Sequence, residues 1–426
     1  MNRWPIMKSF FDEKKFVKQH LDSYNDFIER GLQQVIDDQG GIETDIEGFY
    51  VKFGKIRADI PRARDADGST RFLYPQETRL RDLTYAVPLY LDIVPIVAGE
   101  EKEPVEVAIG ELPVMVKSKL CALYGKSDQE LIEVGEDPKD PGGYFIISGS
   151  EKVIVAIEDL APNKILIERS SRTSSVVAKV FSTRHGFRAL VKLERKKDGL
   201  LRVSFPSVPG RIPFVTVMKA LGLTKDQDIV NAVSAEQEIQ KELLDNLEES
   251  IDITSEEEAL DVIGKRVAIG QLVEYRLKRA HYSIDRYLLP HIGTKPEDRI
   301  RKAYYLGIMA DRAIELALAK REEDDKDHYS SKRLRLAGDL LQNLFRLSLI
   351  QLTRDIKYQL ERTYARGKFQ QGKEHEFVKK SVRADVLTER MRHAMATGQW
   401  PGGRTGVSQL LDTVNYMSKL SHLRRV

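Results

Sequence analysis

The chain has 426 residues, of which 41% are hydrophobic and 31% are charged, and its net charge is +3. This composition is typical of globular rather than disordered proteins, and the length favours two to four domains. No run of about 18 apolar residues occurs, so no contact with a membrane is predicted. Cys121 is the only cysteine. A disulfide within the chain and a cysteine-rich zinc site are therefore excluded, and a cytoplasmic location is expected.

Charge is unevenly distributed along the chain. The range 170–202 holds nine Lys/Arg against two Asp/Glu, and the range 361–426 holds thirteen against six, so each has a net charge of +7. The range 229–263 holds one against eleven, a net charge of −10. The basic ranges can be ordinary solvated faces or can contact nucleic acid, and both interpretations stay open. The acidic range is not expected to touch phosphates.

Hydrophobic periodicity near the N-terminus predicts a helix from Phe10 to Gln34, with Gly31 close to its end. The range 48–60 alternates between apolar and polar residues and predicts a strand or hairpin arm. The range 83–97 is apolar but contains Pro88 and Pro95, so we expect short strands separated by breaks. After a turn cluster at 136–143, short β-branched runs between 144 and 167 predict a sheet.

The character of the sequence changes after Glu168. Three strands are predicted, over 176–181, 187–193 and 200–205. An acidic helical region follows, and then helices over 268–289 and 300–320. We therefore expect residues 169–319 to form a separate, smaller domain, and the fold class of the whole chain to be α+β with several domains.

The clearest helix prediction covers 336–364. Its apolar residues fall on one stripe with Ser348 in the gap: Leu340, Leu344, Leu352, Ile356 and Leu360. A second helix is predicted over 383–397. A Gly/Pro loop and a final helix beginning at Val407 are expected after it.

Two stretches resemble ligand-binding motifs without completing them. The range 367–374 approaches the phosphate-binding loop pattern, but Glu374 stands where Ser or Thr should hold magnesium. The acidic range 322–328 can supply carboxylates for magnesium, although an exposed acidic turn is the favoured interpretation. No histidine pair or Ser/His/Asp arrangement occurs at a recognisable spacing. The sequence therefore predicts no catalytic residue and no metal site.

Four long motifs occur along the chain. They are GGYFIISGSEKV at 142–153, DDKDHYSSKRLRLAG at 324–338, TGQW at 397–400, and GVSQLLD at 406–412 continuing to SHLRR at 421–425. In this order they resemble the second-largest, beta-like subunit of archaeal and eukaryotic multisubunit DNA-directed RNA polymerases, with greater overall similarity to the archaeal type.

The resemblance implies an architecture. Residues 1–168 correspond to the protrusion domain, completed by 320–360, and residues 169–319 correspond to the lobe. Residues 361–426 correspond to the fork, which is incomplete at its C-terminal end. By the family pattern the chain is therefore expected to be a truncated subunit or one product of a divided gene.

The resemblance also implies a function. The chain is expected to be a component of DNA-directed RNA polymerase, a nucleotidyltransferase, and to form one wall of the DNA cleft and the fork at the downstream edge of the transcription bubble. The catalytic magnesium is held by an aspartate triad of the largest subunit, so this chain is expected to bind no cofactor and to be inactive alone. Expected partners are the other polymerase subunits, especially the largest, together with DNA, the RNA–DNA hybrid and transcription factors.

The fork residues are the candidates for nucleic-acid contact: Arg404, Gln409, Arg424 and Arg425. Glycines at 402, 403 and 406 let a backbone approach a duplex, and Arg404 offers a charge to phosphate. The resemblance places this loop against downstream DNA. An ordinary turn between two helices is the alternative.

The segment from Ser408 to Arg425 resembles the bacterial segment that lines the rifamycin pocket beside the RNA path. A buried structural role for Asp412 and Arg425, either paired or hydrogen-bonded, is an equally open interpretation of two of its residues. For the chain as a whole, the alternative function is a stand-alone nucleic-acid-binding scaffold without polymerase partners. Co-purification from cells distinguishes the two.

Overall fold

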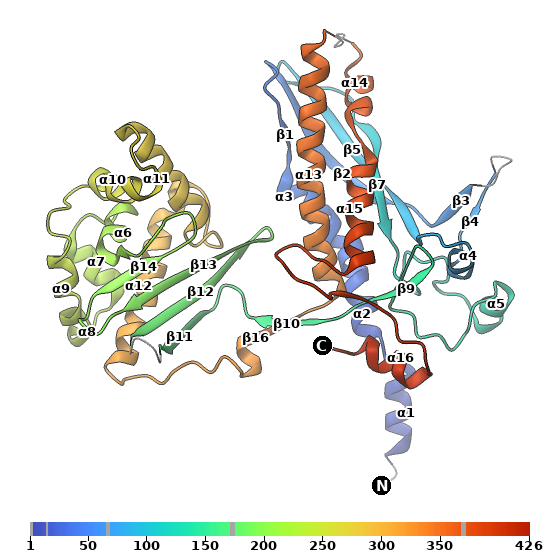
Figure 1. The fold of residues 1–426 in the computed structure, drawn as a ribbon, viewed down its shortest axis with the longest axis horizontal. Helices are drawn as coiled ribbons and strands as arrows, with labels where there is room; N and C mark the ends of the chain where they lie inside the picture. Colours follow the sequence, from blue (N-terminus) through green and yellow to red (C-terminus); the bar gives the residue numbers. More distant parts are fainter. Residues whose placement is uncertain (1–2, 14–15, 65–68, 171–174, 368–371) are drawn as a thin grey trace. The chain divides into compact units, whose positions relative to one another are not determined.

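The computed structural model describes all residues except 1–2, 14–15, 65–68, 171–174 and 368–371. It contains two compact units (Figure 1). Unit 1 comprises Met1–Glu158 and Leu334–Val426, and unit 2 comprises Asp159–Arg333. Each unit combines helices with antiparallel sheets, so the predicted α+β class is confirmed. The assignment of protrusion, lobe and fork, with the bounds given above, stays a prediction.

A five-stranded antiparallel sheet lies at the centre of unit 1. Its strands are β1 (Gly41–Glu43), β2 (Phe49–Ala58), β5 (Ala86–Val97), β6 (Glu100–Glu101) and β7 (Val105–Pro113). Strand β5 pairs with β2, β6 and β7. Alternate residues of β5 are buried, as expected for a strand with one face in the core.

The prolines of β5 do not interrupt it, so the prediction of separate strands was wrong. Both prolines still accept hydrogen bonds through their carbonyl groups: the Asp59 amide lies 3.2 Å from the Pro88 oxygen, and the Lys102 amide lies 2.9 Å from the Pro95 oxygen. The register between β5 and β7 also shifts next to Leu89, which accommodates the missing donor.

The N-terminal helices differ from the single predicted helix. They are α1 (Trp4–Glu13), α2 (Lys18–Asp26), the π-turn η1 (Phe27–Gly31) and α3 (Leu32–Gln39). Residues 14–15 lie outside the described residues. The predicted end at Gln34 was wrong, because the helical path continues through the π-turn that contains Gly31 and on to Gln39. A Cβ on Gly31 would lie 3.1 Å from the Phe27 ring and 3.3 Å from the Gln342 side chain, so the glycine permits close packing.

Three helices from the C-terminal segment complete the core of unit 1: α13 (Ala337–Ala365), α14 (Glu374–Ser381) and α15 (Ala384–Thr397). Helices α13 and α15 lie side by side (Figure 1). The predicted stripe of α13 is buried along its whole length, which confirms the prediction. Ser348 is tolerated within it because its hydroxyl donates to the Leu344 carbonyl at 2.8 Å.

A second, three-stranded sheet of unit 1 has the order β17-β9-β8. Its strands are β8 (Phe145–Ile147), β9 (Ser150–Ile154) and β17 (Ser408–Leu410), and α16 (Tyr416–Leu423) follows the last of them. The predicted helix from Val407 was therefore wrong at its start. The chain is extended there because β17 pairs with β9, and the Ser408 hydroxyl donates to the Met395 carbonyl at 2.6 Å.

The remaining elements of unit 1 are short. They are β3 (Arg62–Arg64), β4 (Thr70–Phe72), α4 (Pro75–Leu80) and α5 (Asp128–Glu133). Strands β3 and β4 pair with each other in antiparallel orientation. Helix α5 begins with a capping box, in which Ser127 and Glu130 satisfy each other's backbone amides.

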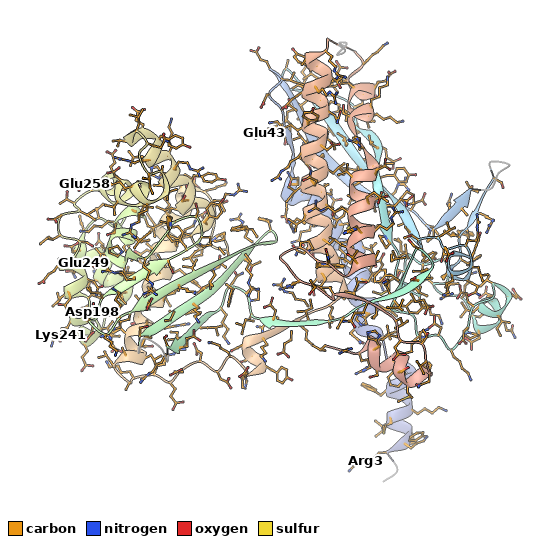
Figure 2. The ribbon with its side chains drawn as sticks, in the orientation of Figure 1. Arg3, Glu43, Asp198, Lys241, Glu249 and Glu258 are labelled. Atoms are coloured by element: carbon orange, nitrogen blue, oxygen red, sulfur yellow. The ribbon has the colours of Figure 1, made fainter. Side chains whose placement is uncertain are left out.

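Unit 2 has its own core. Its sheet runs in chain order through β11 (Ile165–Arg169), β12 (Val176–Arg184), β13 (Phe187–Arg195), β14 (Leu201–Ser204) and β15 (Ile212–Pro213). The helices are α6 (Phe214–Ala220), α7 (Asp226–Val233), α8 (Gln237–Glu242), α9 (Leu244–Glu248), α10 (Glu256–Val267), α11 (Val273–Tyr287), the 3₁₀ turn η2 (Pro296–Asp298) and α12 (Arg299–Ala317). The three strands and the helices predicted for this region are confirmed. Figure 2 labels Lys241 of α8, Glu249 directly after α9 and Glu258 of α10, and all three are exposed.

The chain enters and leaves unit 2 through β10 (Ile157–Leu160), the 3₁₀ turn η3 (Tyr329–Ser331) and β16 (Lys332–Arg335). Strands β10 and β16 pair with each other. The charged side chains of Lys332, Arg333 and Arg335 therefore lie on a strand. Within the described ranges, none of the helices has the length and apolar character needed to cross a membrane.

Candidate nucleic-acid interface

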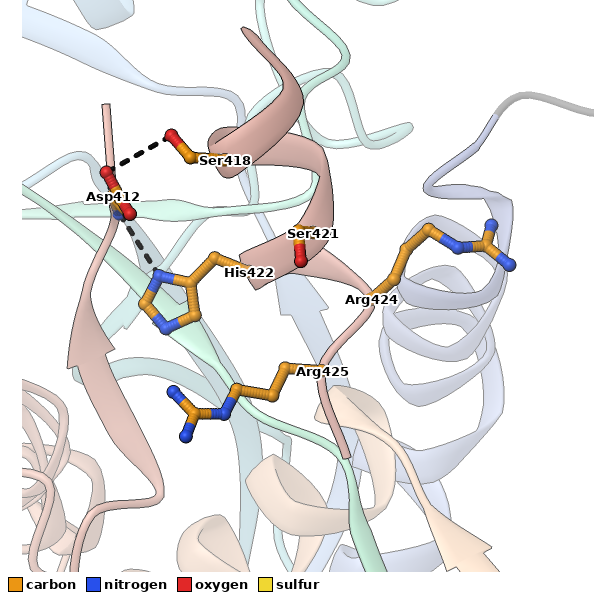
Figure 3. A pocket seen from close by; sticks show the side chains of 6 residues that line it. All are labelled: Asp412, Ser418, Ser421, His422, Arg424 and Arg425. Carbon is orange, nitrogen blue, oxygen red and sulfur yellow. Dashed lines mark hydrogen bonds between the residues drawn. The ribbon is translucent and has the colours of Figure 1, made fainter. Parts of the chain in front are cut away.

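An open pocket of about 670 Å³ lies beside α16 in unit 1 (Figure 3). Its lining residues come from the turn after β17 and from α16 with the residues that follow it: Asp412, Ser418, Ser421, His422, Arg424 and Arg425. Two arginines, a histidine and one carboxylate are therefore among its lining residues. The pocket brings together two of the four residues that the sequence predicted to contact nucleic acid.

Local hydrogen bonds fix where α16 begins. The Asn415 side chain accepts from the Ser418 amide at 2.8 Å, and the Ser418 hydroxyl accepts from the Asn415 amide at 3.2 Å. This reciprocal cap explains why the helix starts at Tyr416. The Asp412 carboxylate accepts from the Val414 amide at 3.1 Å and from the Ser418 hydroxyl at 3.2 Å, which folds the turn between β17 and α16.

His422 is held on both ring nitrogens. Its Nδ1 accepts from the Asp412 amide at 3.1 Å, so the proton of the neutral ring lies on Nε2, which donates to Gln409 Oε1 at 3.1 Å. Burial lowers the pKa of His422, and the nearby positive charge of Arg425 lowers it further. The ring is therefore neutral near pH 7, and the positive charge of the pocket comes from its arginines.

The interpretation of Asp412 and Arg425 as buried residues was wrong, although the Asp412 carboxylate does accept hydrogen bonds. Both residues are exposed, and no ion pair joins them among the described residues. The reason is their placement at opposite ends of α16 (Figure 3). Asp412 is occupied at the start of the helix, whereas Arg425 follows its last residue and leaves its guanidinium facing the pocket.

Arg424 differs from its neighbour. Its Nη1 donates to the Phe16 carbonyl at 2.9 Å, so the side chain points away from His422 (Figure 3). His20 holds the same end of the helix through a contact between its Nε2 and the Leu423 carbonyl at 2.5 Å. The two contacts fasten the C-terminal end of α16 to the N-terminal region of unit 1.

Arg404 lies in the glycine-rich loop and does not line the pocket. The loop connects α15 to β17, so its interpretation as a turn between two helices was wrong. Gly402 and Gly403 have φ values of +85° and +74°, which other residues rarely adopt. The Arg404 carbonyl accepts from the Trp400 amide at 2.7 Å, and the buried Trp400 ring donates to the Leu340 carbonyl at 3.0 Å. The base of the loop is thus anchored on α13.

The two incomplete ligand-binding motifs, at 367–374 and 322–328, remain to be placed in the structure. Residues 368–371 of the near phosphate-loop pattern lie outside the described residues. The Glu374 carboxylate accepts from the Gly372 amide at 2.8 Å, and this hydrogen bond is the main cause of its lowered pKa. In the acidic range 322–328, Asp324 accepts from the Ile167 amide at 2.9 Å. Across the part of the chain that is described, no group of three or more His, Cys, Asp or Glu side chains could hold a metal ion.

Three residues that hold α16 in place were not predicted from the sequence: Lys419, Asp140 and His20. Lys419 and Asp140 form an ion pair of 2.7 Å with little exposure on either side. His20 and Lys419 contact partners hundreds of residues away in the chain. No local sequence pattern predicts contacts between residues so far apart. The only signal nearby is the family motif at 142–153, which begins two residues after Asp140.

Comparison with known proteins identifies the family. The chain belongs to the RNA polymerase beta subunit family, whose model matches residues 15–389. The predicted resemblance to the second-largest polymerase subunit is therefore confirmed.

Similar chains cover almost all of this sequence. The DNA-directed RNA polymerase subunit Rpo2 of Saccharolobus solfataricus is 52% identical over 426 residues, which are 100% of this chain and 37% of the relative. The subunit Rpo2N of Methanococcus vannielii is 53% identical over 431 residues, covering 99% of this chain and 85% of the relative. The subunit Rpo2N of Halobacterium salinarum is 51% identical over 438 residues, with 99% and 82% covered. All three organisms are archaea, which agrees with the archaeal type of the resemblance.

Proposed function

We propose that this chain is a component of a DNA-dependent RNA polymerase, in which it forms one wall of the DNA cleft and part of the fork at the downstream edge of the transcription bubble. The pocket beside α16 carries the proposal. It places Arg425 in an open, positively charged hollow next to a neutral histidine, a surface suited to the backbone of a nucleic acid. Family membership supplies the context.

The glycine-rich loop supplies a second contact. Gly402 and Gly403 have open space where side chains would be, so a duplex can approach the backbone closely there. Arg404 is then within the same loop and offers its charge to a phosphate. Gln409 is less suited to direct contact, because both ends of its amide are occupied, by His422 and by the Gly406 carbonyl at 2.9 Å.

The test uses the assembled polymerase and measures open-complex lifetime across a salt series. Each neutralised phosphate contributes roughly 0.9 to the slope of log affinity against log salt. Arg404→Ala and Arg425→Ala are each expected to flatten the slope by about one unit, with little dependence on DNA sequence. Arg392→Ala is the matched control, because Arg392 pairs with Glu389 on the surface of α15. Unchanged slopes for both variants would remove the pocket and the loop from the nucleic-acid interface.

We expect the purified chain alone not to extend an RNA primer in the presence of magnesium. The family resemblance assigns the catalytic aspartate triad to the largest subunit, so the chemistry needs that partner. Template-directed nucleotide incorporation by the isolated chain would contradict this expectation. Co-purification with a set of polymerase subunits supports the polymerase role, whereas recovery as a monomer favours a stand-alone nucleic-acid-binding scaffold.

A further inference from the structure

Helix α16 and the residues after it carry three basic side chains that differ in direction. Arg424 and Arg425 line the pocket, whereas Lys419 does not. The Lys419 side chain is only 17% exposed. A lysine ammonium is strongly hydrated and is rarely placed inward unless a partner compensates the lost water.

Asp140 is that partner. Its Oδ1 lies 2.7 Å from the Lys419 ammonium, and its Oδ2 accepts from the Tyr144 hydroxyl at 2.5 Å. The ammonium also lies 4.6 Å from the centre of the Tyr144 ring, within the range of a cation–π contact. Tyr144 is fully buried, and burial raises the pKa of its hydroxyl well above the ordinary value, so the phenol keeps the proton it donates.

The hydrogen bonds that begin at Lys419 and Asp140 continue from Tyr144 to the three-stranded sheet β17-β9-β8. Arg79 Nη2 donates to the Tyr144 hydroxyl at 2.6 Å, and Arg79 Nε donates to Glu151 Oε1 at 2.8 Å. The remaining nitrogen of the guanidinium, Nη1, donates to Glu136 Oε2 at 3.1 Å. Arg79 therefore joins Tyr144 to β9, where Glu151 lies, and its charge is matched by two carboxylates.

The path then returns to the pocket. The Glu151 carbonyl accepts from the Leu411 amide at 3.0 Å, next to β17, and Gln409 of β17 accepts from His422 at 3.1 Å. His422 lies on α16, three positions after Lys419. Polar contacts, joined by the backbone of β9 and β17, thus form a closed circuit that connects α16 to the core of the unit and back to α16.

The circuit matters because α16 is short. It has eight residues, of which only Leu420 and Leu423 are buried. Isolated helices of this length are unstable in water, and tertiary contacts must hold them. A pocket lined by such a helix keeps its shape only if the helix is fixed at several points.

We infer that Lys419, Asp140, Tyr144 and Arg79 are positioning residues for the pocket: they fix α16 against β17 and thereby hold His422 and Arg425 in place. The nucleic-acid consequence of this inference rests on the proposed function, but the positioning itself does not. None of the four residues lines the pocket, so they act through the residues that do.

The first test is independent of nucleic acid. The 426-residue chain with isotope-labelled histidines is titrated by NMR, and the His422 signal is assigned by its loss in His422→Gln. In the native chain the pKa of His422 lies below about 6.5 because the ring is partly buried beside Arg425. Lys419→Met is expected to raise it toward 6.5, since a loosened helix exposes the ring to water. Lys419→Arg retains the charge and is expected to stay close to the native value.

Matched controls separate positioning from general destabilisation. Lys380→Met removes an exposed ion pair with Glu376 and is expected to leave His422 unchanged. The pKa values of His281 and His291, which lie in unit 2, are expected to be the same in every variant. If Lys419→Met fails to fold, Tyr144→Phe takes its place, because it keeps the ring and removes only the hydroxyl link. An unchanged His422 pKa in the folded variant overturns the inference.

The second measurement links positioning to the proposed function. In the assembled enzyme, Lys419→Met is expected to shorten the open-complex lifetime without changing its salt slope, because Lys419 contacts Asp140 and not a phosphate. A slope flattened by about one unit would overturn the inference, since it would show direct contact with nucleic acid. A shifted His422 pKa with an unchanged lifetime supports positioning and counts against the nucleic-acid role of the pocket.

Discussion

Units 1 and 2 build their cores from different kinds of contact. Unit 2 is one continuous segment whose sheet joins β11 to β15 in chain order. Unit 1 is formed by two segments, one before and one after unit 2 in the sequence. Its three-stranded sheet pairs Ser408 with Ile154. Local pairing costs little loop entropy, whereas pairing across such a separation costs more and forms later. Unit 2 therefore contains everything its fold needs, and unit 1 depends on both ends of the chain.

The largest expected effect on folding comes from expressing segments of the chain separately. Residues 159–333 expressed alone are expected to fold cooperatively, because their core is formed within the segment. Residues 1–158 alone are expected not to fold, because α13 and α15 supply much of the core of unit 1. Circular dichroism during thermal unfolding measures both.

Limited proteolysis of the intact chain provides an independent check of the same difference. Cuts close to the bounds of unit 2, near 159 and 333, are expected to leave a stable central piece. Uniform degradation without an intermediate would contradict the independent folding of unit 2. A cooperative transition in residues 1–158 alone would contradict the claim that unit 1 needs both of its segments.

The same difference explains what the sequence could predict. The strands and helices of unit 2 were predicted because each follows from local periodicity, and the α13 stripe was predicted for the same reason. The strand β17 was missed because its partner β9 is remote, and nothing between Val407 and Leu411 distinguishes a short strand from a helix start. The unbroken β5 was missed because the neighbouring strands that accommodate its prolines are not visible locally.

A single glycine tests how closely the two segments of unit 1 approach. Gly338, near the start of α13, has its amide 3.0 Å from the Ser23 hydroxyl of α2, and an added Cβ would lie 2.0 Å from the Ser23 carbonyl oxygen. Backbone cannot yield as a flexible side chain does. Gly338→Ala is therefore expected to cost at least about 3 kcal/mol of the free energy of unfolding, at the upper end of overpacking.

Urea unfolding of the intact chain measures this cost. Gln351→Ala, on the exposed face of α13, is the matched control and is expected to change stability by less than about 0.5 kcal/mol. Only the transition of unit 1 should move, since Gly338 and Ser23 both belong to it. A variant as stable as the native chain would mean that α2 and α13 can separate freely.

The candidate site shows the same limit of prediction. The sequence predicted Arg424 and Arg425 as contact residues, and both line the pocket. The pattern Asn415 to Ser418 holds a cap that could have marked the start of α16. The supports of the site were not predictable, because Lys419 finds Asp140 and His20 finds Leu423 only after the two segments of unit 1 meet. Residues that touch a ligand can match a family motif, whereas residues that position them depend on the fold.

Internal cations mark a further difference between the units. In unit 1, Arg79 is matched by Glu136 and Glu151. In unit 2, the fully buried Lys302 donates to two neutral acceptors in the last turn of α11, the Ile284 carbonyl at 2.9 Å and the Asp285 carbonyl at 2.8 Å. Burial without a directly bound carboxylate lowers the pKa of Lys302 to about 8.

This lowered pKa makes the stability of unit 2 depend on pH. In the unfolded chain the lysine has a pKa of about 10.4, so between pH 8 and that value the unfolded state binds more protons. The free energy of unfolding of unit 2 is therefore expected to rise across this window because of Lys302. Lys302→Met removes the rise, and at pH 7 it is expected to cost about 1–3 kcal/mol because both carbonyls lose their donor.

Urea unfolding of residues 159–333 at pH 7, 8, 9 and 10 measures both effects. Lys278→Met is the control, because Lys278 is exposed on α11, the helix whose carbonyl groups accept from Lys302, and should leave the pH dependence intact. The window of the rise identifies its source: an ordinary surface lysine would begin to titrate only near pH 10. If Lys302→Met keeps the same rise between pH 8 and 10, another group is responsible, and the buried lysine is held as firmly by two carbonyls as Arg79 is by its carboxylates.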